Sequence, residues 1–208
     1  MTERENVTMS ETEESNIITI SDDTANPAPL GLFAFGMCTV LLSLINAGTI
    51  PMDSMILNMG LFYGGIAQIM VGVMESRKGN TFGWVAFTSY GFFWVSFVAI
   101  NVFPDIGWMA AASDGGMIAY LVMWCVFSVV CFIGTLKLNR VLQAIFGLVV
   151  LLFVLLIIGG ATGNQGITML AGYEGVVTGI VCLYAAAAFL LNEMYDQKLL
   201  PIGELEQA

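Results

Sequence analysis

The sequence predicts an all-α integral membrane protein with six transmembrane helices and both termini in the cytoplasm. Three observations lead to this prediction. Of the 208 residues, 58% are hydrophobic and only 11% are charged, whereas a soluble domain carries about 25% charged residues. The apolar residues gather in six blocks, each close to the roughly 20 residues that span a bilayer. The few basic residues all fall on one side of the membrane when six spans are counted.

Residues 1–25 are polar and acidic, and we expect them to form a disordered N-terminal tail. They carry seven of the 16 acidic residues, and a segment with little apolar surface cannot offset the entropy cost of ordering. They lack the basic start and apolar run of a secretory signal. The six-helix transmembrane domain is expected over residues 26–196, and residues 197–208 are expected to form a short cytoplasmic tail.

The N-terminal tail ends at a stretch with two prolines, Asn26-Pro27-Ala28-Pro29-Leu30-Gly31-Leu32. Proline lacks an N–H donor and is excluded from helix interiors, but it suits the first turn of a helix. Pro29 is therefore predicted to lie near the start of the first membrane helix.

The six apolar blocks are separated by polar or proline-containing links. Pro51 lies in the first link, charged residues 75–80 form the second, Pro104 lies in the long third link, and residues 137–140 form a basic fourth link. The blocks cover residues 30–48, 54–74, 81–102, 117–136, 141–160 and 167–192.

The basic residues determine the predicted orientation. With six spans all of them share one face: Arg4, Arg77, Lys78, Lys137, Arg140 and Lys198. An odd number of spans would divide them between the two faces. Because basic residues favour the cytoplasmic side, both termini are predicted to be cytoplasmic, in a multi-pass protein of the cell membrane.

Small residues at helical spacing mark two blocks as helix-contact faces. The second block has Gly60, Gly64 and Gly72, and the sixth has Gly172 and Gly179. Lipid tails give helices no hydrophobic reason to associate, so close backbone approach at small residues contributes much of the packing. These glycines are predicted to lie where helices touch.

The residue types exclude most enzyme chemistry. The chain has no histidine, which rules out histidine proton relays, histidine metal sites and serine–histidine hydrolases. It has no Gly-rich nucleotide loop, and its four cysteines lie in apolar blocks at spacings that fit no metal motif. No enzyme activity, cofactor or metal is expected.

Polar groups inside the apolar blocks are the remaining candidates. Glu75, Glu174 and Glu193 lie near block ends, where we expect solvation at the interface, although Glu193 lies just past a long apolar run. Neutral polar side chains lie deeper, and two interpretations stay open for them: hydrogen bonds between helices, or a pore lined by neutral groups for a small solute. They include Asn58, Gln68, Thr88 and Ser89.

Several motifs together resemble the acetate uptake transporters, also called succinate–acetate permeases. The first is the stretch from Asn26 to Leu32, which matches that family's signature. The others lie at residues 60–68, 78–83, 87–91, 134–137, 140–143 and 200–204. The likeness extends from about residue 25 to residue 204.

The resemblance implies a six-helix subunit in a ring-shaped homo-hexamer that moves acetate and related short carboxylates, with succinate in some members. It also implies one pathway per subunit, narrowed by an apolar constriction. The matching residues are Phe35, Tyr90 and Val149, with Leu148 beside Val149. Valine replaces the leucine of relatives at position 149. Tyr90 is expected to offer its hydroxyl at the narrowest point.

Three questions stay open at this point. Passage can be channel-like or proton-coupled, and a proton would travel on a carboxylate such as Glu193, on water or on the acid itself. Ammonia or ammonium is an alternative solute, as proposed for some relatives. A membrane scaffold or sensor without transport is the alternative from another class.

Overall fold

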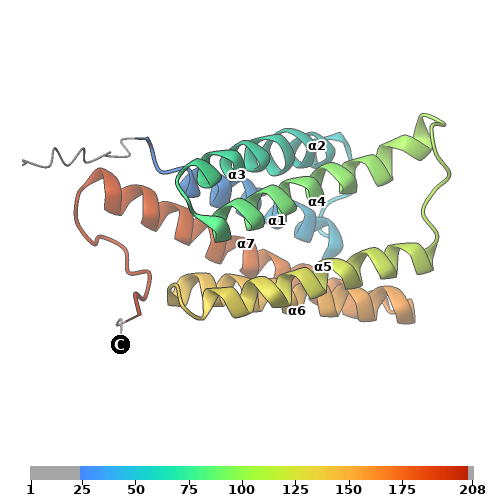
Figure 1. Ribbon diagram of the computed structural model, residues 1–208. Coiled ribbons are helices and arrows are strands. Elements are labelled where there is room, and N and C mark those ends of the chain that lie inside the picture. Colours follow the sequence, from blue (N-terminus) through green and yellow to red (C-terminus); the bar gives the residue numbers. More distant parts are fainter. Residues whose placement is uncertain (1–23, 206–208) are drawn as a thin grey trace, which may run out of the picture.

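Every regular element is helical in the computed structural model, which describes residues 24–205 (Figure 1). The elements are α1 (Ala28–Asn46), α2 (Ser54–Asn58), the π-helix η1 (Met59–Ala67), α3 (Gln68–Arg77), α4 (Thr81–Asp105), α5 (Asp114–Thr135), α6 (Arg140–Thr162) and α7 (Gln165–Met194). Because α2, η1 and α3 are continuous, the described residues hold six helices long and apolar enough to cross a membrane. This confirms the predicted six apolar spans. The predicted N-terminal tail lies outside the described residues, except for residues 24 and 25.

The helices form a bundle with two distinct ends (Figure 1). One end, which we call the termini end, carries both ends of the described chain, the α3–α4 turn (78–80) and the α5–α6 turn (136–139). The α4–α5 link lies at the opposite end, which we call the far end. The described basic residues all belong to the termini end, as predicted: Arg77, Lys78, Lys137, Arg140 and Lys198.

Polar caps carry several helices beyond their apolar blocks. Asn80, Ser113, Asn139 and Asn164 each accept a hydrogen bond from a backbone N–H of the first turn that follows them. Such caps satisfy donors that the helix itself leaves unpaired. As a result α5 starts three residues before the predicted block. The C-terminal end of α4 also differs from the prediction. The helix continues to Asp105 instead of stopping at residue 102, and Pro104 lies in its last turn.

The start of α1 follows the prediction from its prolines. Pro27 precedes the helix and Pro29 lies in its first turn. The Asn26 side chain closes this junction, because its Oδ1 accepts from the Ala28 backbone N at 3.1 Å and its Nδ2 donates to Glu193 Oε2 at 3.0 Å. One side chain therefore joins the start of α1 to the end of α7.

The second span contains a π-helical segment that the sequence did not predict. Within η1, a Cβ on Gly64 would lie 2.7 Å from Trp94 Cγ, and one on Gly65 would lie 2.7 Å from Val95 Cγ2. The glycines thus allow α4 to press against the backbone of η1. Segments of π-helix are frequent at functional sites, and η1 leads directly into Gln68.

Glycines also let α1 and α7 pack closely, as predicted for the sixth block. A Cβ on Gly172 would lie 2.2 Å from Ala47 N, one on Gly175 2.1 Å from Ser43 Oγ, and one on Gly179 2.8 Å from Gly36 O. No side chain fits at such distances. The small residues of α7 are therefore the contact face with α1.

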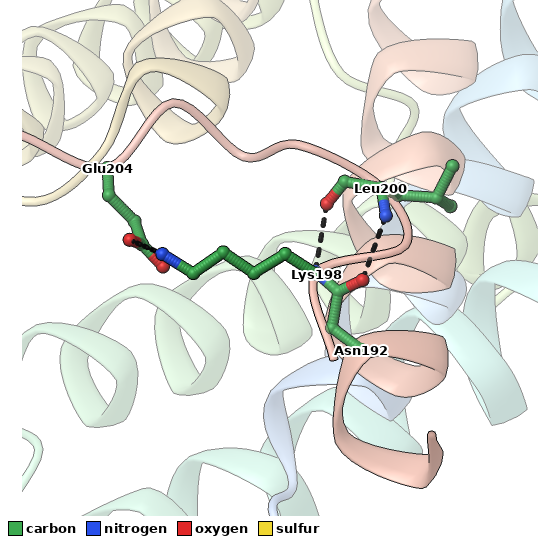
Figure 2. A network of polar contacts seen from close by, with 4 residues as sticks. All are labelled: Asn192, Lys198, Leu200 and Glu204. Atoms are coloured by element: carbon green, nitrogen blue, oxygen red, sulfur yellow. Dashed lines mark hydrogen bonds and ion pairs between the residues drawn. The ribbon is translucent and has the colours of Figure 1, made fainter. Parts of the chain in front are cut away.

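Residues 198–204 fold back over the bundle, whereas the sequence suggested only a short tail. Figure 2 shows Asn192 of α7 beside Leu200: its Nδ2 donates to Leu200 O at 2.8 Å, and its Oδ1 accepts from Leu200 N at 2.9 Å. Lys198 pairs with Glu204 in the same view. Further along, the backbone nitrogens of Arg140 and Val141 donate to carbonyls of residues 203 and 202. This clasp, residues 198–204, joins α7 to the start of α6.

Replacing Asn192 with alanine should open the clasp. Two hydrogen bonds to one backbone position are lost, with a cost of about 1–3 kcal/mol where the backbone groups stay buried. We expect trypsin to cleave after Lys198 faster than in the parent protein. The measurement is the rate of this cleavage, monitored by mass spectrometry of the intact protein.

The matched control is Glu204→Gln, which breaks only an exposed ion pair. Exposed pairs add little stability, so its cleavage rate should equal that of the parent protein. An Asn192→Ala protein as resistant as the parent would show that the backbone contacts to α6 hold the clasp alone.

Candidate functional site

A cavity of about 480 Å³ lies inside the bundle at the termini end. It is lined by α1, α3, α4, α6 and α7 together with the turn before α6. A smaller cavity of about 40 Å³ lies between α1, α4 and α6 and reaches toward the far end as far as Asn46 and Leu156. Phe35, Tyr90 and Val149 line both cavities. These three residues therefore form the partition between the two spaces.

The partition is apolar and tightly packed. The exposed fractions of Phe35, Tyr90 and Val149 are 9%, 4% and 2%. The rings of Phe35 and Tyr90 meet edge to face with centroids 5.2 Å apart, a favourable geometry for aromatic pairs. The sequence assigned these residues through the resemblance, and the structure brings them together.

The Tyr90 hydroxyl is hydrogen-bonded to α5. It lies 2.7 Å from Ser128 Oγ of α5, and Ser128 in turn donates to Trp124 O at 2.7 Å. Since a serine hydroxyl has a single proton, Tyr90 must be the donor to Ser128. Its hydroxyl proton is thus already bound, and Tyr90 presents its ring at the partition. Ser128 was not among the sequence candidates, because only the packing of α5 on α4 shows its role.

The termini end of the large cavity is polar. Its lining includes Gln68, Glu75, Asn80, Lys137 and Asn139. Of these, the sequence singled out only Gln68 as a pathway residue, and the structure places it in the wall at 1% exposure. The motif at residues 78–83 could have pointed to Asn80.

Glu75 corrects one expectation. We expected solvation at the interface, yet its exposed fraction is 3%. Its Oε2 accepts from Asn80 Nδ2 at 2.8 Å, while Oε1 has no hydrogen-bond partner within the described residues. Glu75 lies only two residues from the end of α3, but the turn that follows and the neighbouring helices cover it.

The other sequence candidates lie outside the large cavity. Asn58 donates to Ser54 O at 2.8 Å and lines a separate groove of about 390 Å³ near the far end. Thr88 faces the backbone of Gly72. Ser89 and Leu148 are half-buried and line none of these cavities. The structure does not gather these four residues with the partition.

The signature stretch contributes to the cavity in part. Asn26, Ala28 and Leu32 line it. Gly31 packs against Phe87, whose Cε1 would lie 2.4 Å from a Cβ at that position. Glu193 is exposed and acts on the site through its hydrogen bond to Asn26. The remaining signature residues, Pro27, Pro29 and Leu30, shape the start of α1 without lining the cavity.

Comparison with known proteins gives consistent matches. Residues 11–203 match the GPR1/FUN34/yaaH family. The succinate-acetate/proton symporter SatP of Escherichia coli K12 is 50% identical over 180 residues, covering 86% of this chain and 96% of SatP. An uncharacterized protein of Methanothermobacter thermautotrophicus is 52% identical over 191 residues, covering 88% and 94%.

A yeast relative and a solved structure complete the comparison. The ammonia transport outward protein 2 of Saccharomyces cerevisiae is 37% identical over 172 residues, which cover 79% of this chain and 61% of the yeast protein. The structure of the bacterial acetate channel SatP superposes with a TM-score of 0.85 at 49% identity, covering 86% of this chain and 99% of the solved chain.

Proposed function

This chain belongs to the GPR1/FUN34/yaaH family, and on that premise we propose that it carries acetate and related short carboxylates, succinate among them, across the cell membrane. It is a transporter, not an enzyme. The observation that carries the proposal is the meeting of two cavities at Phe35, Tyr90 and Val149. Two spaces that share one apolar wall are what a solute pathway with a single constriction requires.

The partition suits a small carboxylate. An apolar constriction gates by excluding bulk water, and acetate has a methyl group that can contact Phe35 and Val149. On the termini side, Lys137 lines the cavity and offers a positive charge there. Since Lys137 lies in a turn and not midway along the path, it can attract an anion without trapping it inside.

The orientation and assembly are also part of the proposal. The basic residues of the termini end support a cytoplasmic position for that end, by the positive-inside rule. Each subunit contains its own large cavity, so a ring of six would provide six separate pathways. Large apolar side chains of α5 are exposed, Met123, Val130 and Ile133 among them at 60% or more, and we assign this face to lipid or a neighbouring subunit.

Uptake of radiolabelled succinate and acetate into liposomes that contain the purified protein tests the proposal. Succinate is the sharper probe, because its charge keeps it from crossing protein-free membranes. We expect uptake well above that of empty liposomes, with competition by unlabelled acetate. Uptake at the background level by folded protein would contradict carboxylate transport and favour a membrane scaffold. Uptake of methylammonium, without uptake of either carboxylate, would instead identify ammonium as the solute.

A further inference from the structure

Two buried oxygen atoms in the wall of the large cavity have no hydrogen-bond partner within residues 24–205. They are Oε1 of Gln68 and Oε1 of Glu75. Both residues line the cavity, and both side chains are at least 97% buried, with exposed fractions of 1% and 3%. Seven residues of α-helix make about 700°, or nearly two turns, so the two side chains share one face of α3.

Unpartnered buried acceptors are costly, and native proteins satisfy nearly all of them. At Glu75 the second oxygen accepts from Asn80, so Oε1 is the carboxyl atom left without a hydrogen-bond partner among the described residues. A proton on Oε1 would turn that acceptor into a donor. A carboxylate anion in the cavity could then accept a hydrogen bond from Glu75, whereas an ionised Glu75 would repel it.

We propose that Glu75 is the proton-binding residue of this transporter, and that it holds a proton on Oε1 while a substrate carboxylate lies beside it. This inference rests on the proposed function. On binding, one proton passes from solvent to Glu75 Oε1 as the anion enters. On release, the O–H bond of Glu75 breaks, the proton returns to water and the anion leaves. One proton thus binds with each carboxylate, and the pair adds no net charge to the buried site.

The surrounding groups leave Glu75 as the residue that exchanges a proton. From the α5–α6 turn, Lys137 lines the cavity and complements the anion. On α4, Tyr90 is buried and donates to Ser128. The titratable groups of the other elements packed on α3 are Cys38 of α1, which donates to Met59 O, and Tyr63 of η1; neither lines the cavity. Lys78 follows α3, donates to Thr24 O and places a positive charge near Glu75.

Gln68 has a supporting role in this arrangement. Rotating its terminal amide by half a turn exchanges the oxygen for an NH₂ group, and the two orientations are not distinguished by shape. With its nitrogen toward the cavity, Gln68 would donate to the same carboxylate. It is a binding residue for the anion and takes no part in proton transfer.

The test measures proton uptake when acetate binds to the full-length protein in detergent. Calorimetric titrations in two buffers with different ionisation enthalpies give the number of protons taken up per acetate bound. We expect about one proton for the parent protein near pH 7 and none for Glu75→Gln, which keeps the size and a neutral hydrogen-bonding end. The apparent affinity of the parent should fall about tenfold per pH unit above the titration of Glu75, by linkage, while that of Glu75→Gln stays level.

A matched control is Glu174→Gln. Glu174 is a partly buried carboxyl of α7 whose Oε1 accepts from Thr178 Oγ1 at 2.9 Å, and it does not line the cavity. Its replacement should leave the proton count and the pH profile of the parent unchanged. A proton count of one in Glu75→Gln would overturn the proposal, because the proton would then bind on the substrate itself.

A second variant keeps the test decisive if Glu75→Gln does not fold. Asn80→Asp retains the oxygen that caps α4 but replaces the donor to Glu75 with a carboxyl. With one proton bound, the two neighbouring carboxyls would still carry one negative charge that repels the anion, so acetate binding should need a second proton and be lost at lower pH than in the parent. An unshifted profile would contradict the proposal. Failure of the parent to bind acetate at all would instead contradict the proposed function.

Discussion

Replacing Val149 with phenylalanine should reduce succinate and acetate uptake by about tenfold or more, because it closes the partition between the two cavities. Val149 is 2% exposed and contacts both spaces. The larger ring can extend into the 480 Å³ cavity, so it fills the pathway without forcing α6 away from its neighbours. The measurement is initial uptake into liposomes at equal protein density.

Leu151→Phe is the matched control for this prediction. It introduces the same side chain two residues further along α6, at a position with a 45% exposed side chain that lines neither cavity. Its uptake should equal that of the parent protein. If folded Val149→Phe also transports at the parental rate, Val149 does not belong to the constriction.

Replacing Gly172 with alanine should have the largest effect on stability. The new methyl group would lie 2.2 Å from the backbone nitrogen of Ala47 and 2.7 Å from its Cα. Backbone atoms cannot turn aside as a flexible side chain can, so α1 and α7 must separate. We expect a cost above the roughly 1–3 kcal/mol typical of overpacking, seen as a lower melting temperature and poor recovery of monodisperse protein.

Gly160→Ala provides the comparison. A Cβ at Gly160 of α6 would lie 3.8 Å from Ile118 Cγ1, which is an ordinary van der Waals contact. Alanine is favoured over glycine within a helix by roughly 0.5–1 kcal/mol. The melting temperature should therefore stay the same or rise slightly. Equal melting temperatures for the two variants would show that α1 and α7 are free to move apart.

The sequence alone was sufficient for the helical layout. Apolar blocks of membrane-spanning length and the one-sided basic residues predicted six helices, and the glycines predicted contact faces that the structure places between α1 and α7. These features depend on local composition and spacing, which a sequence displays directly. The helix ends were less predictable, since caps such as Ser113 extend helices into polar flanks.

The candidate site was predicted only in part. The resemblance pointed to Phe35, Tyr90 and Val149, but nothing in the spacing of residues showed that the Tyr90 hydroxyl turns to Ser128. Glu75 looked like a solvated residue at a helix end. Its burial depends on the α3–α4 turn and on helices distant in the chain, so it is a property of the assembled bundle.

Asn26 shows how the two levels combine. The sequence by itself predicted that α1 starts at Pro27 and Pro29, which follow Asn26. Proline lacks the backbone N–H that a helix interior needs, but it suits the first turn. Only the tertiary structure showed that Asn26 bonds to Glu193 and lines the large cavity. The two residues are 167 positions apart, and packing of α1 on α7 is what brings them together. Helices follow from local chemistry, whereas the cavity, its partition and its buried carboxyl follow from which helices touch.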